Sequence, residues 1–305
     1  MIKKAILTGA TGYIGSSLLR ELLKKKWRVI IVVRKTSSFH YIQDIKNEVE
    51  IFEFDNDLNK MVDLFDEIKP DVVFHLASKV IVQHDINDIP DIINSNVLFA
   101  TQILEAMTRT NTANIVNTGT SWQHFGNEQY NPVNLYAASK EAFFSILKYY
   151  NEAFGVHSIT LELFDTYGPN DKRPKVLNLI KDIDKNSASL EMTPGEQEVN
   201  LVFINDVVRA YIIAAEILIS DNERHVNKSF SICAKETVTL KELVILYEMV
   251  NKTELDIKWG AKSYRNREVM SIWNKGEILP GWNAEIKLEE GLHLFCECEQ
   301  GGKHK

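Results

Sequence analysis

Short apolar runs alternate with longer amphipathic segments over the first half of the chain. The runs are nearly continuous in Val, Ile, Leu and Phe, as expected of strands covered on both faces. They predict strands at Lys4–Thr8, Val29–Val33, Val49–Phe54, Val72–Leu76, Asn114–Thr118 and Ser158–Leu163. Helical periodicity between them predicts helices at Tyr13–Lys26, Lys60–Ile68, Ile89–Thr110 and Leu135–Phe154. This alternation indicates βαβ units and an α/β fold, a doubly wound parallel sheet of the Rossmann type.

After Gly168-Pro169 the regular alternation of apolar runs and amphipathic segments ends, and the order of the predicted elements becomes mixed and irregular. We predict helices at Lys175–Lys185, Asn205–Ile219 and Thr239–Asn251, strands at Glu198–Phe203 and Ser229–Ile232, and a short final helix near Leu288–Leu292. Thr239 followed three residues later by Glu242 is a capping box. The chain therefore divides into a dinucleotide-binding domain (1–168, with sheet contributions from about 198–218 and 229–233) and a smaller substrate lobe (169–305).

The first predicted strand runs into a glycine turn that opens a helix. Gly9 permits the tight turn, Gly12 lets backbone N–H groups approach a pyrophosphate, and Gly15 lets the helix pack closely on the strand. The N-terminus of this helix adds a positive dipole for the phosphates. We expect the dinucleotide to contact Gly9, Thr11, Gly12, Tyr13, Ile14 and Gly15.

The end of the second strand indicates which dinucleotide binds. A carboxylate there favours NAD, whereas this strand ends in Arg34-Lys35, and a guanidinium suits a 2′-phosphate. We therefore predict NADP(H), with NAD as the alternative if this is only a solvated basic loop. Asp55, or else Asp57, is placed to contact the adenine, although either is equally a turn aspartate.

Tyr136 and Lys140 form the second candidate constellation. Their i,i+4 spacing places both side chains on one face of a helix. An ammonium beside a phenol stabilises the phenolate and lowers its pKa, which makes the tyrosine a usable acid or base. The pair gains weight from its position after a strand that ends in Thr118-Gly-Thr-Ser121.

Composition narrows the range of partners. The chain has 305 residues and a formal net charge of −7, which argues against nucleic acid as a partner. No run of eighteen apolar residues predicts a membrane span, and the start Met1-Ile-Lys-Lys leaves no room for a signal peptide, so we expect a cytoplasmic protein. Cys296 and Cys298 lack further thiol or paired histidine ligands, so no metal is predicted.

These motifs together resemble the extended short-chain dehydrogenase/reductases that act on nucleotide-diphosphate sugars. The resemblance rests on Gly9–Gly15, Ser121 and the Tyr136/Lys140 pair, and it extends over nearly the whole chain. It includes His75-Leu-Ala-Ser78, Asn96-Val97, Leu163-Phe-Asp-Thr-Tyr-Gly-Pro169, Asn205-Asp-Val207 and Pro280-Gly-Trp282 through Leu288–Leu292.

The resemblance implies a role for each matching residue. Tyr136 would exchange a proton with the sugar hydroxyl, Lys140 would hold the nicotinamide ribose, and Ser121 would orient the sugar oxygen. Thr120 is the alternative to Ser121, and a turn cap is the structural alternative for Ser121. Further cofactor contacts are implied at Leu76, Ala77, Ser78, Asn96 and Thr118, and substrate contacts at Thr120, Trp122, Gln123, Asp165, Lys175 and Arg265.

The resemblance also suggests a subclass. Related sugar 4,6-dehydratases have an Asp-Glu pair where this chain has Trp122-Gln123, and related 3,5-epimerase/reductases have a cysteine at the position of Gln123. Of the reactions known in the resembling family, reduction of a 4-keto group and 4-epimerisation remain as candidates. Arg34 favours exchangeable NADPH and hence a reductase of an NDP-4-keto-6-deoxy or 3,6-dideoxy hexose for bacterial surface polysaccharides. The string Thr118–Phe125 is similar to the CDP-linked 3,6-dideoxyhexose synthases, although CDP, dTDP and GDP all stay open.

Two features leave alternatives open. Asp165 stands where the family usually has asparagine, and a carboxylate repels a sugar diphosphate unless a cation offsets it. Arg265 resembles a pyrophosphate ligand, or else it belongs to a solvated charged loop. The family also implies a homodimer through Ile89–Thr110 and Leu135–Phe154, whose apolar positions equally permit plain burial. A dinucleotide-sensing protein without chemistry is the non-enzyme alternative.

Overall fold

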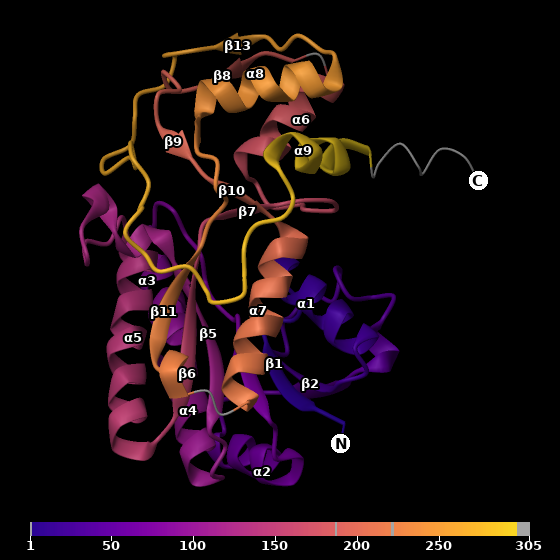
Figure 1. The fold of residues 1–305 in the computed structure, drawn as a ribbon, viewed down its shortest axis with the longest axis vertical. Helices are drawn as coiled ribbons and strands as arrows, with labels where there is room; N and C mark the ends of the chain where they lie inside the picture. The colour runs from indigo at the N-terminus through magenta and orange to yellow at the C-terminus, as the bar shows by residue number, and fades with distance from the viewer. Residues whose placement is uncertain (1, 187, 221–222, 298–305) are drawn as a thin grey trace.

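A parallel seven-stranded sheet forms the centre of the larger half of the molecule (Figure 1). The computed structural model describes residues 2–186, 188–220 and 223–297. The strand order is β11-β6-β5-β4-β1-β2-β3, and every neighbouring pair is parallel. The strands are β1 (Lys4–Thr8), β2 (Arg28–Val33), β3 (Glu50–Glu53), β4 (Val72–His75), β5 (Asn114–Thr120), β6 (His157–Leu163) and β11 (Lys228–Ile232). The predicted doubly wound α/β fold is confirmed.

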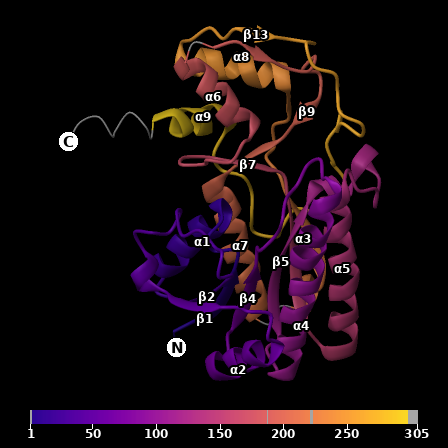
Figure 2. The ribbon, with the colours of Figure 1, turned by 180° about the vertical axis from the view of Figure 1, so that it is seen from behind.

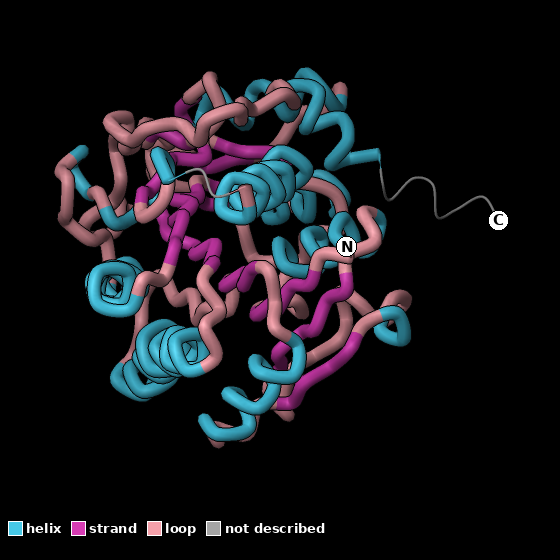
Figure 3. Tube along the Cα trace, turned by 60° about the horizontal axis from the view of Figure 1, so that its bottom comes forward, coloured by secondary structure: helices cyan, strands magenta, loops and turns pink. Residues whose placement is uncertain are grey.

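Helices cover both faces of this sheet (Figure 3). One face carries α1 (Tyr13–Lys24) and α7 (Ile204–Ile219). The other carries α2 (Leu58–Ile68), α4 (Phe99–Arg109) and α5 (Leu135–Phe154), and α4 and α5 lie side by side in Figure 2. Neighbouring strand residues such as Ile115 and Val116 enter opposite core clusters, because successive side chains of a strand point to opposite faces.

The predicted helix Ile89–Thr110 is interrupted by a wider turn. The structure has α3 (Ile89–Ile93), a π-helical segment η3 (Asn94–Leu98) and then α4. The π turn holds the buried amide of Asn96, which bonds across to the loop after β4 and to α5. Isolated π turns of this kind often occur at functional sites, and amphipathic periodicity alone does not reveal them.

The smaller half is built from short elements above the carboxyl ends of the sheet (Figure 1). Its helices are α6 (Val176–Asn186), α8 (Leu240–Asn251) and α9 (Leu288–Glu297). Its strands are β7 (Asp165–Tyr167), β8 (Leu190–Glu191), β9 (Glu198–Val199), β10 (Leu201–Phe203), β12 (Val238–Thr239) and β13 (Ile257–Lys258). The Thr239–Glu242 capping box is confirmed, with the Glu242 N–H 3.2 Å from the Thr239 hydroxyl.

The predicted strand Glu198–Phe203 divides at Asn200 into β9 and β10. The Asn200 amide donates to the Ala234 carbonyl at 2.9 Å and accepts from the Ala234 N–H at 2.8 Å, so this side chain ties the bend to a distant loop. From the later part of the chain, β11 returns to the larger half and extends the main sheet beside β6. The division of the chain at residue 168 stays a prediction.

No helix in the three described ranges has the length and apolar character needed to cross a membrane. Of the two closely spaced cysteines, Cys296 lies on α9, and Cys298 lies outside the described residues.

Candidate active site

The glycine turn after β1 packs against the loop after β4. Gly9 has a φ of +74°, and a Cβ there would lie 2.6 Å from the Ala77 backbone nitrogen. A Cβ on Gly15 would lie 2.1 Å from the Gly9 carbonyl oxygen, so only glycine lets α1 approach β1 this closely. Gly12 is the N-cap of α1 and makes no side-chain cap, which leaves the backbone N–H groups of the first turn open to an anion.

The end of β2 presents two exposed cations. Arg34 and Lys35 are both exposed, and within the described residues no ion pair or side-chain hydrogen bond engages either charged group. The Arg34 N–H is held by the Ser37 hydroxyl at 3.0 Å, which fixes the turn. This arrangement leaves the guanidinium free to pair with an anionic ligand.

The two candidate aspartates after β3 differ in their surroundings. Asp57 is the N-cap of α2, and its carboxylate accepts from the Asn59 N–H at 3.0 Å. Asp55 is exposed and pairs with Lys60, whose hydrogen bond holds the pKa of the Asp55 carboxyl below its usual value. Both carboxylates are thus engaged within the protein, and the choice between Asp55 and Asp57 for an adenine contact stays a prediction.

Tyr136 and Lys140 lie buried on the first turns of α5, with 8% and 3% of their surfaces exposed. Burial raises the pKa of the Tyr136 phenol to about 12, while the hydroxyls of Thr120 and Ser78 act in the opposite direction. Burial lowers the pKa of the Lys140 ammonium to about 8. We expected the lysine to lower the phenol pKa. The structure differs because desolvation of the phenolate dominates, so Tyr136 carries its proton at neutral pH.

Thr120, the alternative to Ser121, lies against the phenol. Its buried hydroxyl acts on Tyr136 and also accepts from the Trp122 N–H at 3.3 Å. Ser121 begins the short 3₁₀ segment η4 (Ser121–Gln123), and its hydroxyl makes no hydrogen bond within the part of the chain that the structure describes. The strand β5 extends two residues beyond its predicted end. Thr120 is therefore its last residue, and the Thr120 hydroxyl lies against the phenol.

Trp122 and Gln123 take different positions. The Trp122 ring lies edge-on to the Tyr136 ring with centroids 6.5 Å apart, beside the proposed reaction centre. Gln123 is buried, and its amide accepts from the Thr120 N–H at 3.0 Å and donates to Glu141 at 2.6 Å. Both ends of the Gln123 amide are therefore used within the protein, which gives Gln123 a supporting position behind Thr120.

Asn96 connects three elements beside the helix that carries Tyr136. Its amide accepts from the Ser78 hydroxyl at 3.0 Å and from the Lys79 N–H at 2.7 Å. It donates to the Ser139 hydroxyl on α5 at 2.9 Å. Asn96 thus fixes the loop that follows β4, including Leu76 and Ala77, relative to the helix that carries Tyr136.

Sequence reasoning missed Tyr211. This residue on α7 is fully buried, and its hydroxyl lies 2.7 Å from Thr118, which in turn donates to the His75 carbonyl at 2.8 Å. His75 is buried and bonds to Thr8, and burial lowers the pKa of its imidazole to about 3, assisted by Lys140. Tyr211 lies inside an apolar helix, where no local pattern marks a hydroxyl that reaches β5.

Asp165 is paired with a cation in the smaller lobe. The Lys175 ammonium lies 2.6 Å from its carboxylate. Burial alone would raise the pKa of Asp165, but Lys175, Arg173 and Arg265 together hold it below its usual value. The expected repulsion of a diphosphate is therefore offset. Arg265 pairs with Glu268 at 2.6 Å, and its field also reaches Asp165.

Arg173 is a second residue that sequence reasoning missed. Its guanidinium forms a bidentate pair with Asp171 and lies 4.6 Å from the Tyr13 ring centroid. It therefore joins the glycine-turn helix to the start of the smaller lobe.

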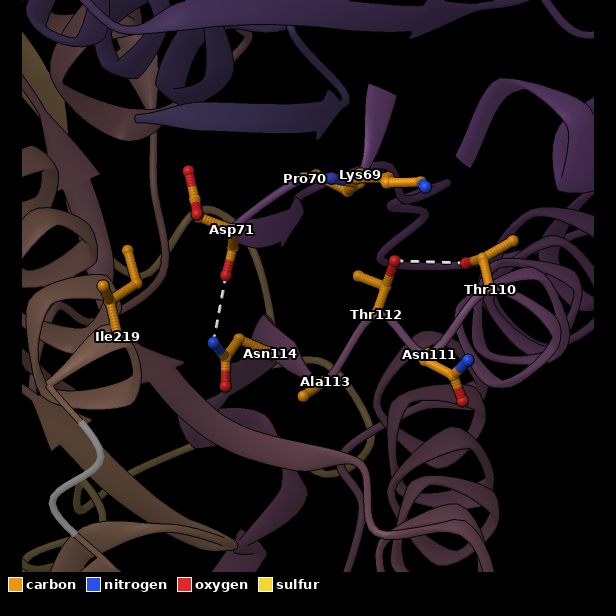
Figure 4. A pocket seen from close by; sticks show the side chains of 9 residues that line it. All are labelled: Lys69, Pro70, Asp71, Thr110, Asn111, Thr112, Ala113, Asn114 and Ile219. Atoms are coloured by element: carbon orange, nitrogen blue, oxygen red, sulfur yellow. Dashed lines mark hydrogen bonds between the residues drawn. The ribbon is translucent and has the colours of Figure 1, made fainter. Parts of the chain in front are cut away.

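A surface hollow of about 330 Å³ lies away from these residues, at the amino ends of β4 and β5 (Figure 4). Asn114 donates there to the Asp71 carbonyl at 3.0 Å, and the Thr110 and Thr112 hydroxyls are 3.1 Å apart. Ligands of doubly wound sheets bind at the carboxyl ends of the strands, so this hollow carries no part of the candidate chemistry.

Comparison with known proteins identifies the family. Residues 5–227 match the NAD dependent epimerase/dehydratase family. The chain is 32% identical to a CDP-abequose synthase of Yersinia pseudotuberculosis over 94% of this chain and 97% of that protein. It is 26% identical to a putative UDP-glucose 4-epimerase of Methanocaldococcus jannaschii, over 94% and 95% of the two chains. A UDP-glucose 4-epimerase structure from Thermotoga maritima superposes with a TM-score of 0.85 at 21% identity, over 98% and 99%. The chain belongs to this family of nicotinamide-dependent enzymes, which confirms the resemblance to extended short-chain dehydrogenase/reductases.

Proposed function

We propose that this member of the family is an NADPH-dependent reductase of a nucleotide-diphosphate 4-keto-6-deoxy or 3,6-dideoxy hexose, used for bacterial surface polysaccharides. The observation that carries the proposal is the geometry of the buried Tyr136 phenol, which shares one helix with Lys140 and lies against the hydroxyls of Thr120 and Ser78. A protonated phenol beside the Thr120 hydroxyl is suited to give a proton to a ketone oxygen.

The reaction requires one hydride and one proton. When bound, NADPH would supply the hydride for the new C–H bond at carbon 4 of the sugar. Tyr136 donates its proton to the carbonyl oxygen as that oxygen gains negative charge, and a hydroxyl results. Lys140, charged below a pKa of about 8, stabilises the phenolate that Tyr136 becomes. Solvent then returns the proton to Tyr136.

The residues beside Tyr136 favour reduction over dehydration. Trp122 and Gln123 have no group that titrates usefully, and the Gln123 amide is engaged by Thr120 and Glu141. Loss of water from a sugar needs an additional acid and base near carbons 5 and 6, and these two positions provide neither. The names of the CDP-abequose synthase relatives support a CDP-linked substrate.

The residues at the end of β2 support NADPH. Arg34 is exposed and has no carboxylate partner in the described ranges, so it can form charge-assisted bonds to a 2′-phosphate. The sugar diphosphate is expected to lie between Lys175 and Arg265, which surround the Asp165 carboxylate.

The test is a spectroscopic assay at 340 nm with purified protein, NADPH and enzymatically prepared CDP-, dTDP- and GDP-4-keto-6-deoxy sugars. We expect stoichiometric loss of NADPH with one of them, and the Tyr136→Phe variant serves as the control for bound-cofactor background. Absence of NADPH loss with all three substrates contradicts the reductase.

An NDP-hexose 4-epimerase is the second candidate. The relative of Methanocaldococcus jannaschii, a putative UDP-glucose 4-epimerase, favours it. An epimerase oxidises and re-reduces the same sugar, so it retains its cofactor and consumes none. NAD that co-purifies and resists dialysis, together with interconversion of UDP-hexoses, would select this candidate.

We also propose a homodimer through α3, η3, α4 and α5, which correspond to the predicted helices Ile89–Thr110 and Leu135–Phe154. Apolar side chains remain exposed on and beside these helices, namely Ile86, Ile89, Ile93, Leu98, Tyr149 and Phe154. Exposed apolar side chains of this size on neighbouring helices are commonly covered by a partner. Light scattering should give about twice the mass of one chain, and an Ile89→Glu, Ile93→Glu double variant should give the mass of one.

A further inference from the structure

Two segments far apart in the sequence are fastened together beside the candidate site. We define the catalytic turn as residues 120–131, between β5 and α5, and the strap as residues 265–277, which contains Arg265. In Figure 1 the yellow-orange chain descends from β13 to the end of the sheet and then rises to α9. The strap is thus a long irregular connection whose position depends on what it contacts.

Polar contacts fasten the two ends of the strap to the turn. The Asn127 amide donates to the Asn274 side chain at 2.8 Å, and the Lys275 ammonium donates to the Asn127 carbonyl at 2.8 Å. The Arg267 guanidinium bonds to Asn131 and lies 4.2 Å from the centroid of the Phe125 ring.

His124 lies at the centre of this interface. Its ring stacks on Trp273 of the strap, with centroids 4.1 Å apart and planes inclined by 15°. Both residues are buried, with 6% and 5% of their surfaces exposed. A positively charged ring over an indole face is a favourable cation–π arrangement.

Both nitrogens of His124 face acceptors. Nδ1 lies 2.8 Å from the Gln129 carbonyl oxygen and 3.2 Å from that of Glu128. Nε2 lies 3.3 Å from the Glu162 carboxylate on β6, as an ion pair without an aligned hydrogen bond. A neutral imidazole donates from only one nitrogen, so this environment favours the doubly protonated, positively charged ring.

Glu162, on β6, holds the His124 ring against the sheet. It is buried, and a Cβ added to neighbouring Gly119 of β5 would lie 3.2 Å from its side chain. A buried ion pair adds little net stability, because desolvation of both charges offsets their attraction. The His124–Glu162 ion pair is better explained by the geometry that it imposes on the residues next to Thr120.

We propose that His124, charged and held by Glu162, is a positioning residue that clasps the strap to the catalytic turn. The clasp sets the distance between the strap, which carries Arg265, the proposed ligand of the sugar diphosphate, and the turn, whose Thr120 lies against the Tyr136 phenol. The catalytic consequence rests on the proposed function, whereas the clasp itself does not.

The clasp has a defined dependence on pH. Burial alone would lower the pKa of His124, but Glu162 and the two carbonyls raise it above its usual value. The charged ring therefore persists to a higher pH than that of a free imidazole, and it is lost as pH rises through the raised pKa. Other charged groups on the elements that meet there are Glu141, which binds the Gln123 amide, and Arg267 and Lys275, which bind Asn131 and Asn127 of the turn.

Two variants and one control test the clasp. His124→Phe keeps a ring on Trp273 and removes both N–H groups, while Glu162→Gln keeps the shape of the side chain and removes its charge. His293→Gln alters an exposed histidine on α9 and serves as the control. Trypsin cleaves after Arg265, Arg267 and Lys275, so fragment masses report release of the strap.

We expect strap cleavage to be about tenfold faster in His124→Phe, and faster to a lesser degree in Glu162→Gln, with no change in the control. The KM for the sugar nucleotide should rise about tenfold, while the Kd for NADPH stays within about twofold. Nitrogen-15 NMR of the wild type should show both His124 nitrogens protonated at pH 7.

A neutral His124 at pH 7 overturns the proposal, as does wild-type strap cleavage in both variants. If His124→Phe fails to fold, Glu162→Gln decides, since only a charge is removed. If the wild type turns over no sugar nucleotide, the proposed function fails, and the protease and NMR measurements still decide whether the clasp exists.

Discussion

The two halves of the molecule are held together in different ways. The larger half rests on strands of four to seven residues, whose side chains enter two apolar clusters. The smaller half contains strands of two or three residues, and its loops are fixed by side chains that bond to distant backbone. Hydrophobic burial is non-directional, whereas these polar contacts each depend on one residue in one place.

Asp206 illustrates the second kind of construction. Its buried carboxylate pairs with Arg209 at 2.7 Å and accepts from the backbone N–H groups of Glu285 and Ile286 at 3.0 Å. Its own carbonyl accepts from the Trp282 indole at 2.8 Å. Asp206 therefore fixes the position of the segment 282–286, which leads into α9. The comparison teaches that the main sheet rests on many apolar contacts, whereas single polar residues fix the loops of the smaller half.

Tyr136→Phe is expected to give the largest effect, and it acts on chemistry within the larger half. Removal of the phenol proton should lower turnover by about 10²- to 10⁴-fold. The melting temperature and the Kd for NADPH should remain near the wild-type values, because the ring stays in place. Tyr130→Phe, at an exposed position, is the control. Full activity of Tyr136→Phe would contradict the assigned role.

Asp206→Ala should produce the largest loss of stability. It leaves Arg209 without its buried partner and two backbone N–H groups without an acceptor, at a cost of about 3–5 kcal/mol. Urea unfolding measures this change. Glu285→Ala, which removes the exposed partner of Arg209, should have a much smaller effect. Equal effects of the two variants would contradict the distinction drawn between buried and exposed anchors.

Arg34→Ala should weaken the use of NADPH and leave the fold intact. Loss of charge-assisted bonds to a 2′-phosphate raises the KM for NADPH by about 10- to 100-fold. The KM for NADH should change little, since NADH lacks that phosphate. Steady-state kinetics with both cofactors provides the measurement. An equal change for NADH and NADPH would argue for a general effect on the loop.

Activity should fall as the pH rises above about 8. The pKa of Lys140 is lowered to about 8 by burial, so its charge is present below that pH and is lost above it. In the proposed mechanism, loss of the ammonium removes the charge that stabilises the Tyr136 phenolate. The profile of kcat/KM from pH 6 to pH 10 tests this, and a flat profile across that range would contradict it.

Asp44→Asn should have the smallest effect on stability, because the Asp44 carboxylate is exposed whereas that of Asp206 is buried. The Arg20–Asp44 pair lies on the surface at 2.6 Å, and the hydrogen bond from Arg20 lowers the pKa of Asp44 to about 2. Its contribution is present above the ordinary aspartate pKa and is lost as pH falls through about 2. Solvent screens the pair, so the melting temperature should move by no more than about 1 °C.

Sequence reasoning placed the main sheet well, because local patterns encode it. Strands buried on both faces carry continuous apolar runs, and the predicted ends of β1 and α5 agree with the structure. The glycine turn was equally readable, since Gly9 and Gly15 are required by close backbone contacts.

The rest of the site depends on contacts between distant residues. Whether Thr120 or Ser121 meets Tyr136 depends on where β5 ends, which no local signal fixes. The neutralisation of Asp165 by Lys175 joins residues on β7 and just before α6, and the doubly engaged amide of Gln123 depends on Glu141 on α5. Such pairings become visible only when the chain is folded.

The π turn at Asn94–Leu98 also sets the rotational phase of the helix around it. An α-helix advances by about 100° per residue, so one extra residue in a turn rotates everything before it relative to everything after it. Deleting one residue there would yield a regular helix with a better backbone ladder. It would also swing the isoleucines of α3 around the axis and withdraw Asn96 from Ser139. A more regular helix would thus displace both the exposed isoleucines of α3 and the amide that connects Asn96 to α5.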